Sequence, residues 1–310
     1  MPDNRRPPLD HVAQFARGFA MGAADIVPGV SGGTVALVLG IYDRLIRNIR
    51  LGARGLRQGL TGDFAGFRQT LRDIEWIWLI TLLGGILVAV FALSSVLEQL
   101  LTDEPIAMAG LFFGLVVGTL WIAWNLLDRV DAVSVGIIAG VGVVLFLVLG
   151  LRESTEAAED AAEVVTKPFW VFALAGAIAI CAMILPGISG SFILVLLGMY
   201  TEVLGAVNDR DFAALGAFMV GCVIGLAVFS TLLHWLLENY RNQVIAAMIG
   251  LMIGSMRVLW PWPNGTHTTQ LSAPADEVVL PIVLALLGAG VVIAVEHFSS
   301  RVGTMPDSLD

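Results

Sequence analysis

The chain has 310 residues, of which 57% are apolar and only 14% are charged, and its mean hydropathy is +0.85. A soluble domain of this length carries more charge and less apolar surface, so we expect a polytopic membrane protein. The net charge of -9 argues against nucleic acid as a partner, because binding to a phosphate backbone needs a cationic surface.

The first predicted element is a re-entrant helical hairpin in residues 11–50, preceded by a polar tail, residues 1–10, that we expect to be disordered. The hairpin turns at residues 24–34, Ala-Asp-Ile-Val-Pro-Gly-Val-Ser-Gly-Gly-Thr. Each arm is about 16 residues or roughly 24 Å long at helical rise, which is short of the roughly 30 Å hydrocarbon core. Proline ends a helix and glycine admits backbone conformations closed to other residues, so this stretch should interrupt the apolar segment.

Three long apolar segments follow the hairpin, approximately residues 76–97, 105–127 and 132–151, and each is long enough to span a membrane. They complete a first repeat over residues 11–151. Between Arg44 and Arg72 lie seven arginines, which are typical of a cytoplasmic loop under the positive-inside rule. The acidic connections after the first and third spans are then expected outside.

A second repeat is predicted over residues 168–297, followed by a C-terminal tail, residues 298–310. It contains a hairpin at 168–207 that turns at Ile-Leu-Pro-Gly-Ile-Ser-Gly-Ser, residues 184–191, and spans at about 215–237, 244–260 and 278–297. The match extends from the motifs to Gly40 and Tyr42, which align with Gly198 and Tyr200.

Parity sets the expected geometry of this duplication. If each hairpin returns to its starting side, each half crosses the membrane an odd number of times, so the second half is inverted. The predicted fold is therefore an all-α polytopic membrane protein with an inverted repeat, each half comprising a re-entrant helical hairpin plus three transmembrane helices. Both termini are expected in the cytoplasm.

The two motifs have the chemistry of an anion site. Successive small residues leave backbone N–H groups free, serine adds a hydroxyl, and a helix begins immediately afterwards; such turns and helix N-termini bind phosphate. The predicted substrate-binding residues of the motifs are Pro28, Gly29, Ser31, Gly32, Gly33 and Thr34, with Pro186, Gly187, Ser189, Gly190 and Ser191. The alternative is that the glycines allow close helix packing and the prolines only form kinks.

Three charged residues inside or near apolar segments join the predicted site. Asp25 precedes the first motif and is a candidate for binding a coupling ion, a proton or sodium, or for pairing with Arg17; alternatively it accepts hydrogen bonds from the loop backbone. Arg17 and Arg257 are positioned to meet a phosphate, although Arg257 lies near a span end and can instead extend to the interface. No cofactor, metal site or catalytic residue is expected.

At these motifs, followed by Gly-Ile-Tyr-Asp-Arg-Leu at 40–45 and Leu-Gly-Met-Tyr at 197–200, the chain resembles the PopT family of prokaryotic membrane proteins. The resemblance covers nearly the whole chain. It implies a transporter of the cytoplasmic membrane that returns a polyprenyl phosphate lipid carrier, such as undecaprenyl phosphate, from the outer to the cytoplasmic leaflet during cell-envelope glycan synthesis. It supplies no catalytic residues to carry over.

Two other functions stay open on the sequence. A membrane-embedded lipid pyrophosphate phosphatase also handles this carrier, but it would want an arginine beside the motif serine and several carboxylates within the membrane. A transporter of a small soluble anion would need a cavity closed to lipid on all sides.

Overall fold

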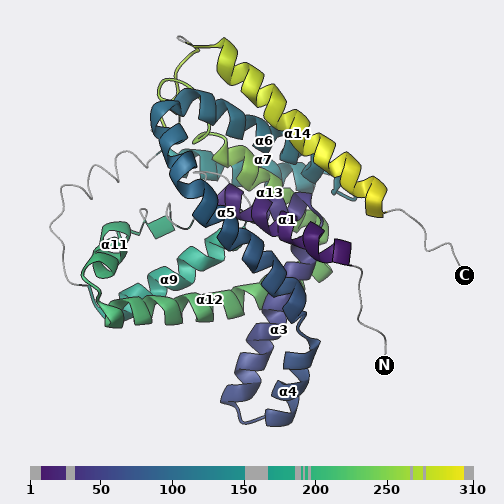
Figure 1. The fold of residues 1–310 in the computed structure, drawn as a ribbon, viewed down its shortest axis with the longest axis vertical. Helices are drawn as coiled ribbons and strands as arrows, with labels where there is room; N and C mark the ends of the chain where they lie inside the picture. The colour runs from purple at the N-terminus through teal and green to yellow at the C-terminus, as the bar shows by residue number, and fades with distance from the viewer. Residues whose placement is uncertain are drawn as a thin grey trace, which may run out of the picture.

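The computed structural model describes residues 8–25, 32–150, 167–185, 190, 193–194, 197–265, 268–274 and 277–303. All regular structure within these ranges is helical. In chain order the helices are α1 (Pro8–Asp25), α2 (Gly32–Val38), α3 (Tyr42–Leu60), α4 (Phe64–Asp73), α5 (Trp76–Asp103), α6 (Pro105–Asn125), α7 (Ala132–Leu149), α9 (Phe169–Ile184), α11 (Tyr200–Asn208), α12 (Phe212–Asn239), α13 (Arg241–Ser255) and α14 (Val279–Gly303) (Figure 1).

Four helices are long and apolar enough to cross a membrane, namely α5 over Trp76–Leu93, α6, α7 and α12. Helix α9 and the segment Val279–Ala294 of α14 are apolar but shorter. Large apolar side chains such as Phe91, Val228 and Leu286 are exposed on the outer helices, as lipid-facing positions should be. The prediction of an all-α polytopic membrane protein is therefore confirmed.

Eight of the described helices associate as four pairs: α1 with α5, α9 with α12, α6 with α14, and α7 with α13. Suppose that α1, α5, α6 and α7 correspond in turn to α9, α12, α13 and α14. The α1–α5 pair then corresponds to the α9–α12 pair, and the α6–α14 pair corresponds to the α7–α13 pair. Each pair is also parallel, since Gly221 and Gly225 of α12 face Ala173 and Ala177 of α9 in the same order. This is the pairing that a duplicated topology produces.

Helices α5 and α12 have opposite ends beside α3. Helix α5 begins beside α3, where Glu75 contacts Arg44. Helix α12 instead packs on α3 and leads to Arg241, whose Nη1 donates to Asp43 Oδ2 at 2.8 Å. Figure 1 accordingly shows α11 and α3 at opposite ends of α12. An inverted repeat predicts this arrangement, and the inversion stays a prediction together with the repeat boundaries.

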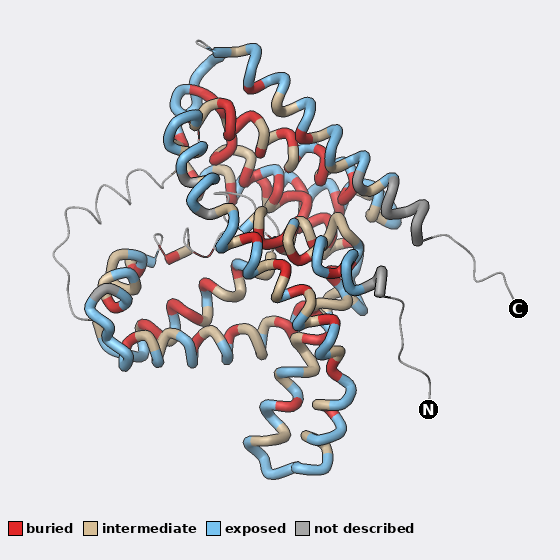
Figure 2. Tube along the Cα trace, in the orientation of Figure 1, coloured by how far each residue is buried: buried red, intermediate tan, exposed pale blue. Residues whose placement is uncertain are grey.

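The buried core lies where α6, α7 and α13 meet. Ile245, Ile249 and Met252 follow one another at helical spacing on α13 and pack with Phe112 of α6 and Ile138 of α7. Figure 2 shows the buried residues gathered along these helices, whereas the α3–α4 hairpin that projects from the bundle is largely exposed. The paired helices therefore contain this buried core.

The arginine-rich segment is not a loop, so that prediction is wrong. It forms α3 and α4, joined by a short turn in which Asp63 accepts a hydrogen bond from Gly66 N at 2.9 Å. Arginine, leucine and glutamine favour helix, and Tyr42 and Ile46, four residues apart, supply a buried face on α3. The positive charge of this segment suggests a loop, although its apolar residues also recur at helical spacing.

The second arm of the first hairpin is also shorter than predicted, because α2 ends at Val38. Gly40 has φ of +65°, a conformation that favours glycine, and Ile41 N donates to Ala36 O at 2.9 Å to close the helix. The second half repeats the closure at Gly198, with φ of +58°, where Met199 N donates to Leu194 O at 2.8 Å. The first arm is therefore the short helix α2, which turns into α3, and the second half has the same closure before α11 begins.

Candidate functional site

The structure describes the flanks of both predicted tips. Asp25 is the last residue of α1, and Gly32, Gly33 and Thr34 open α2, where Thr34 is buried. Gly190 is the described residue of the second tip. The other predicted motif residues lie outside the described residues: Pro28, Gly29, Ser31, Pro186, Gly187, Ser189 and Ser191.

Asp25 closes the first tip against the start of α2. Its Oδ1 accepts a hydrogen bond from Gly32 N at 2.6 Å, so the carboxylate is bound to one of the N–H groups that the sequence assigned to phosphate. The alternative in which Asp25 accepts hydrogen bonds from the loop backbone therefore holds for Gly32. The predicted pairing with Arg17 is not seen, since Arg17 Nη1 bonds instead to Gln14 Oε1 at 3.4 Å.

In the second tip a glycine also packs against the end of the preceding helix, but the side chain that it meets is uncharged. A Cβ added to Gly32 would lie 2.6 Å from Asp25 Oδ2, and one added to Gly190 would lie 2.6 Å from Met183 Cγ. These are corresponding positions in the two motifs. Both glycines are thus held against the end of the preceding helix, by a carboxylate in the first half and by a thioether side chain in the second.

Tyr42 joins the first hairpin to the approach of the second motif. Its hydroxyl donates to the backbone carbonyl of Ile184 at 3.1 Å, and its side chain is only 3% exposed. Ile184 is the last residue of α9, which also packs on α2. Tyr42 was recognised in the sequence only as a match to Tyr200, and no local signal indicates a bond to a residue so distant in the chain.

Arg17 does not meet the first tip. It lies about 12 Å before Asp25 along α1 at helical rise, and it lines a cavity at the start of α5. In that cavity it faces residues from α3 and α5 rather than the motif. The structure therefore does not bring Arg17 together with Gly32, Gly33 and Thr34.

Arg257 lies apart from the first tip as well, just beyond the end of α13. Its Nε donates to Thr269 O at 3.1 Å, its Nη1 donates to Phe146 O at 3.5 Å, and its guanidinium lies 4.7 Å from the centre of the Phe146 ring. With Trp260 it lines a largely apolar cavity of about 390 Å³. The guanidinium is thus fixed by carbonyls and by cation–π attraction.

The chemistry available at the tips is that of binding. Backbone N–H groups, small side chains and one carboxylate suit the capture of an anion and the transfer of a proton. No group of three or more His, Cys, Asp or Glu side chains that could hold a metal ion occurs in the part of the chain that the structure covers.

Comparison with known proteins places both motifs within one family. Residues 21–277 match the VCA0040-like family, described as undecaprenyl phosphate translocase-like. The chain is 40% identical over 283 residues to the polyprenyl-phosphate transporter of Vibrio cholerae serotype O1, an alignment that covers 88% of this chain and 84% of that protein. A protein of the same name from Staphylococcus aureus is 29% identical over 255 residues, 79% of this chain and 84% of that protein. No solved structure is significantly similar. The resemblance drawn from the motifs is confirmed.

Proposed function

Because the chain belongs to the undecaprenyl phosphate translocase-like family, we propose that it moves a polyprenyl phosphate from the outer to the cytoplasmic leaflet for recycling in envelope glycan synthesis. Such a lipid has a charged headgroup, which hydrocarbon excludes, and an apolar tail, which hydrocarbon accepts. The protein then needs to shelter the headgroup alone, while the tail stays in lipid. The observation that carries the proposal is the packing of α9, which leads into the second motif, on α2 and Tyr42.

In this proposal the two tips hold the phosphate. Backbone N–H groups at the start of α2 and around Gly190 donate to its oxygens, together with the hydroxyls of the motif serines. Several such charge-assisted bonds at one point offset the cost of bringing the anion out of water.

Asp25 can couple headgroup binding at the first tip to the uptake of a proton. A phosphate at the start of α2 would lie close to its carboxylate, and two unit charges about 5 Å apart repel by roughly 3 kcal/mol at an effective dielectric constant of about 20. Protonation of Asp25 removes this repulsion and frees the N–H of Gly32, which the carboxylate holds at 2.6 Å. Headgroup binding and proton uptake are then linked; sodium near the carboxylate is the alternative coupling ion.

The arrangement of the halves supports alternating access. Helix α12 ends beside α3, where α5 begins, so the two hairpins enter from opposite faces in this proposal. The arginine-rich α3–α4 hairpin belongs on the cytoplasmic side by the positive-inside rule, and both termini with it. Rocking of one half against the other then exposes the headgroup to each leaflet in turn.

Transport of a fluorescent short-chain polyprenyl phosphate across proteoliposomes tests the proposal. Gly32→Leu and Gly190→Leu should lower the initial rate at least roughly tenfold, because the new side chains would collide with Asp25 and Met183. Gly216→Leu is the matched control, since a Cβ at Gly216 on α12 meets open space. Wild-type rates in both tip variants would rule out the tips as the headgroup site.

Two further readouts complete the experiment. Asp25→Asn should still equilibrate the lipid but should lose any acceleration by an imposed proton gradient. Release of inorganic phosphate from a polyprenyl pyrophosphate by the purified protein would instead support a phosphatase and contradict the proposal.

A further inference from the structure

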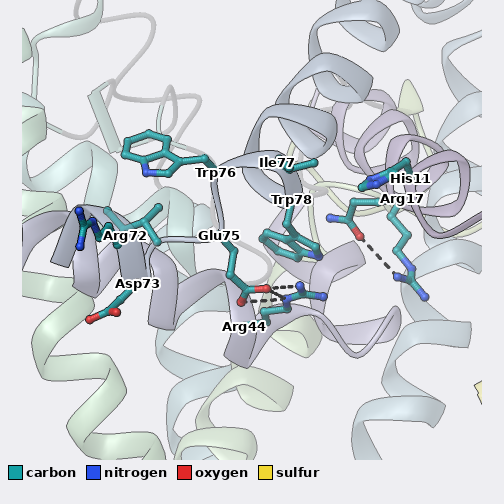
Figure 3. A pocket seen from close by; sticks show the side chains of 11 residues that line it. His11, Arg17, Arg44, Arg72, Asp73, Glu75, Trp76, Ile77 and Trp78 are labelled. Carbon is teal, nitrogen blue, oxygen red and sulfur yellow. Dashed lines mark hydrogen bonds and ion pairs between the residues drawn. The ribbon is translucent and has the colours of Figure 1, made fainter. Parts of the chain in front are cut away.

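A second cavity, of about 400 Å³, lies where α1 and α3 meet the start of α5. His11, Gln14 and Arg17 line it from α1, Arg44 lines it from α3, and Glu75 and Trp78 line it from the start of α5 (Figure 3). It lies beside the arginine-rich hairpin, about 12 Å along α1 from the tip at Asp25. Figure 3 shows the Arg44 guanidinium beside the Trp78 ring, 4.7 Å from its centre, with Arg17 on the α1 side of the cavity.

The arginines that line this cavity differ in whether an acidic side chain balances their charge. Arg44 Nε donates to both carboxylate oxygens of Glu75 at 3.1 and 3.0 Å, and Arg47 Nη2 donates to the same carboxylate at 2.9 Å. Arg17 has no acidic partner among the residues that the structure describes, and its one hydrogen bond there is to the neutral amide oxygen of Gln14. An unmatched guanidinium therefore faces the cavity.

Two residues that line the cavity each carry a buried N–H donor without an acceptor. Gln14 Nε2 and Trp78 Nε1 have no hydrogen-bond partner within the described ranges, and their residues are only 2% and 7% exposed. An unpaired buried donor destabilises a protein, so native proteins retain few of them. An acceptor-rich group placed beside Gln14 and Trp78 would supply the partner that both donors lack.

We propose that this cavity binds a phosphate monoester, the headgroup of the transported lipid on the arginine-rich side of the membrane. A phosphate offers several acceptor oxygens and negative charge, which match the guanidinium of Arg17 and the N–H groups of Gln14 and Trp78. Two guanidinium groups already balance the charge of Glu75. The other carboxylate of the lining, Asp73, is accompanied there by Arg72, so these two residues add no net charge. The lipid as the source of the phosphate rests on the proposed function; the anion chemistry does not.

The rim of the cavity favours a lipid over free phosphate. Trp76 and Ile77 line it and are exposed on the surface of α5, which is apolar along its length. Tryptophan at a helix end is typical of the headgroup level of a membrane. A headgroup in the cavity would thus leave its tail beside apolar surface.

Titration calorimetry on protein in zwitterionic nanodiscs tests the site, with farnesyl phosphate and inorganic phosphate as separate probes. Arg17→Gln should weaken farnesyl phosphate binding at least roughly tenfold, as expected for the loss of a charge-assisted hydrogen bond. Arg68→Gln is the matched control, because Arg68 is an exposed arginine on α4 outside the cavity. Equal affinity in wild type and Arg17→Gln would overturn the proposal.

Gln14→Met separates binding from folding. It keeps the length of the side chain and removes both the unpaired N–H and the oxygen that accepts the 3.4 Å bond from Arg17, so it should weaken farnesyl phosphate binding while leaving the thermal midpoint of the ligand-free protein about equal. A lower midpoint with unchanged binding would show that the amide serves structure alone, and would contradict the proposal. Trp78→Phe, which removes the indole N–H, should weaken binding in the same direction.

Two comparisons distinguish a lipid headgroup from free phosphate, and binding in the cavity from binding at the tips. Inorganic phosphate binding as tightly as farnesyl phosphate would overturn the assignment to a lipid headgroup. In the Gly32→Leu background the cavity should still bind farnesyl phosphate although transport is lost. If wild type binds the lipid at this cavity but does not transport it, the proposed function fails while the cavity site stands.

Discussion

The bond between Tyr42 and Ile184 offers the smallest perturbation of the contact between the two halves. Tyr42→Phe removes one hydroxyl and leaves the carbonyl of Ile184, 3.1 Å away, without that donor. Hydrogen bonds inside membrane proteins contribute about 0.6 kcal/mol on average and about 1.7 kcal/mol at most, and the buried position of Tyr42 suggests a value of about 1 kcal/mol or more. A change of that size alters a population about fivefold.

Two assays measure the effect of Tyr42→Phe. We expect a lower thermal midpoint in detergent and an initial transport rate in proteoliposomes that is lower by about fivefold if the contact is part of the transporting state. Tyr200→Phe is the matched control, since Tyr200 is the counterpart of Tyr42 in the second half and is 41% exposed. If both variants match wild type in both assays, the reasoning that this bond couples the halves is refuted.

Two further predictions concern stability. The pKa of Glu75 is lowered to about 2, chiefly by the hydrogen bond from Arg44, so this carboxylate stabilises the fold fully above its usual pKa of 4.5 and loses that effect as pH falls towards 2. Glu75→Gln should therefore lower the thermal midpoint at neutral pH but not near pH 2, and parallel midpoint curves for the two proteins would contradict this. Gly221→Ala should destabilise by roughly 1–3 kcal/mol, because its Cβ would strike the carbonyl of Ala173, whereas Gly216→Ala on the same helix should be neutral or stabilising in thermal unfolding.

The fold class was predictable because composition and helix length are local properties of the sequence. Long apolar runs specify α5, α6, α7 and α12, and the positive-φ turns at Gly40 and Gly198 occupy matching places in the two motifs. The arginine-rich segment was predicted to be a loop because its positive charge was read as a sign of irregular structure, whereas it forms the helices α3 and α4. The helical spacing of buried residues on α3 was present in the same sequence.

The parts that the sequence did not predict depend on contacts between distant residues. Nothing local to Trp78 indicates that it lines one cavity with Gln14 and Arg17, because Trp78 lies on α5 whereas Gln14 and Arg17 lie on α1, far apart in the chain. The same holds for Arg257, whose guanidinium is held by Phe146 and Thr269. Asp25 is the intermediate case, since its position before the motif suggested a role but not its bond to Gly32.

The most direct test of the central claim is a structure of the protein with a short-chain polyprenyl phosphate, determined by electron cryo-microscopy in nanodiscs. The proposed function predicts phosphate density beside the start of α2 and Gly190, with the tail directed into lipid, in at least one state of the transport cycle. Headgroup density that is confined in every state to a position away from both tips would contradict it.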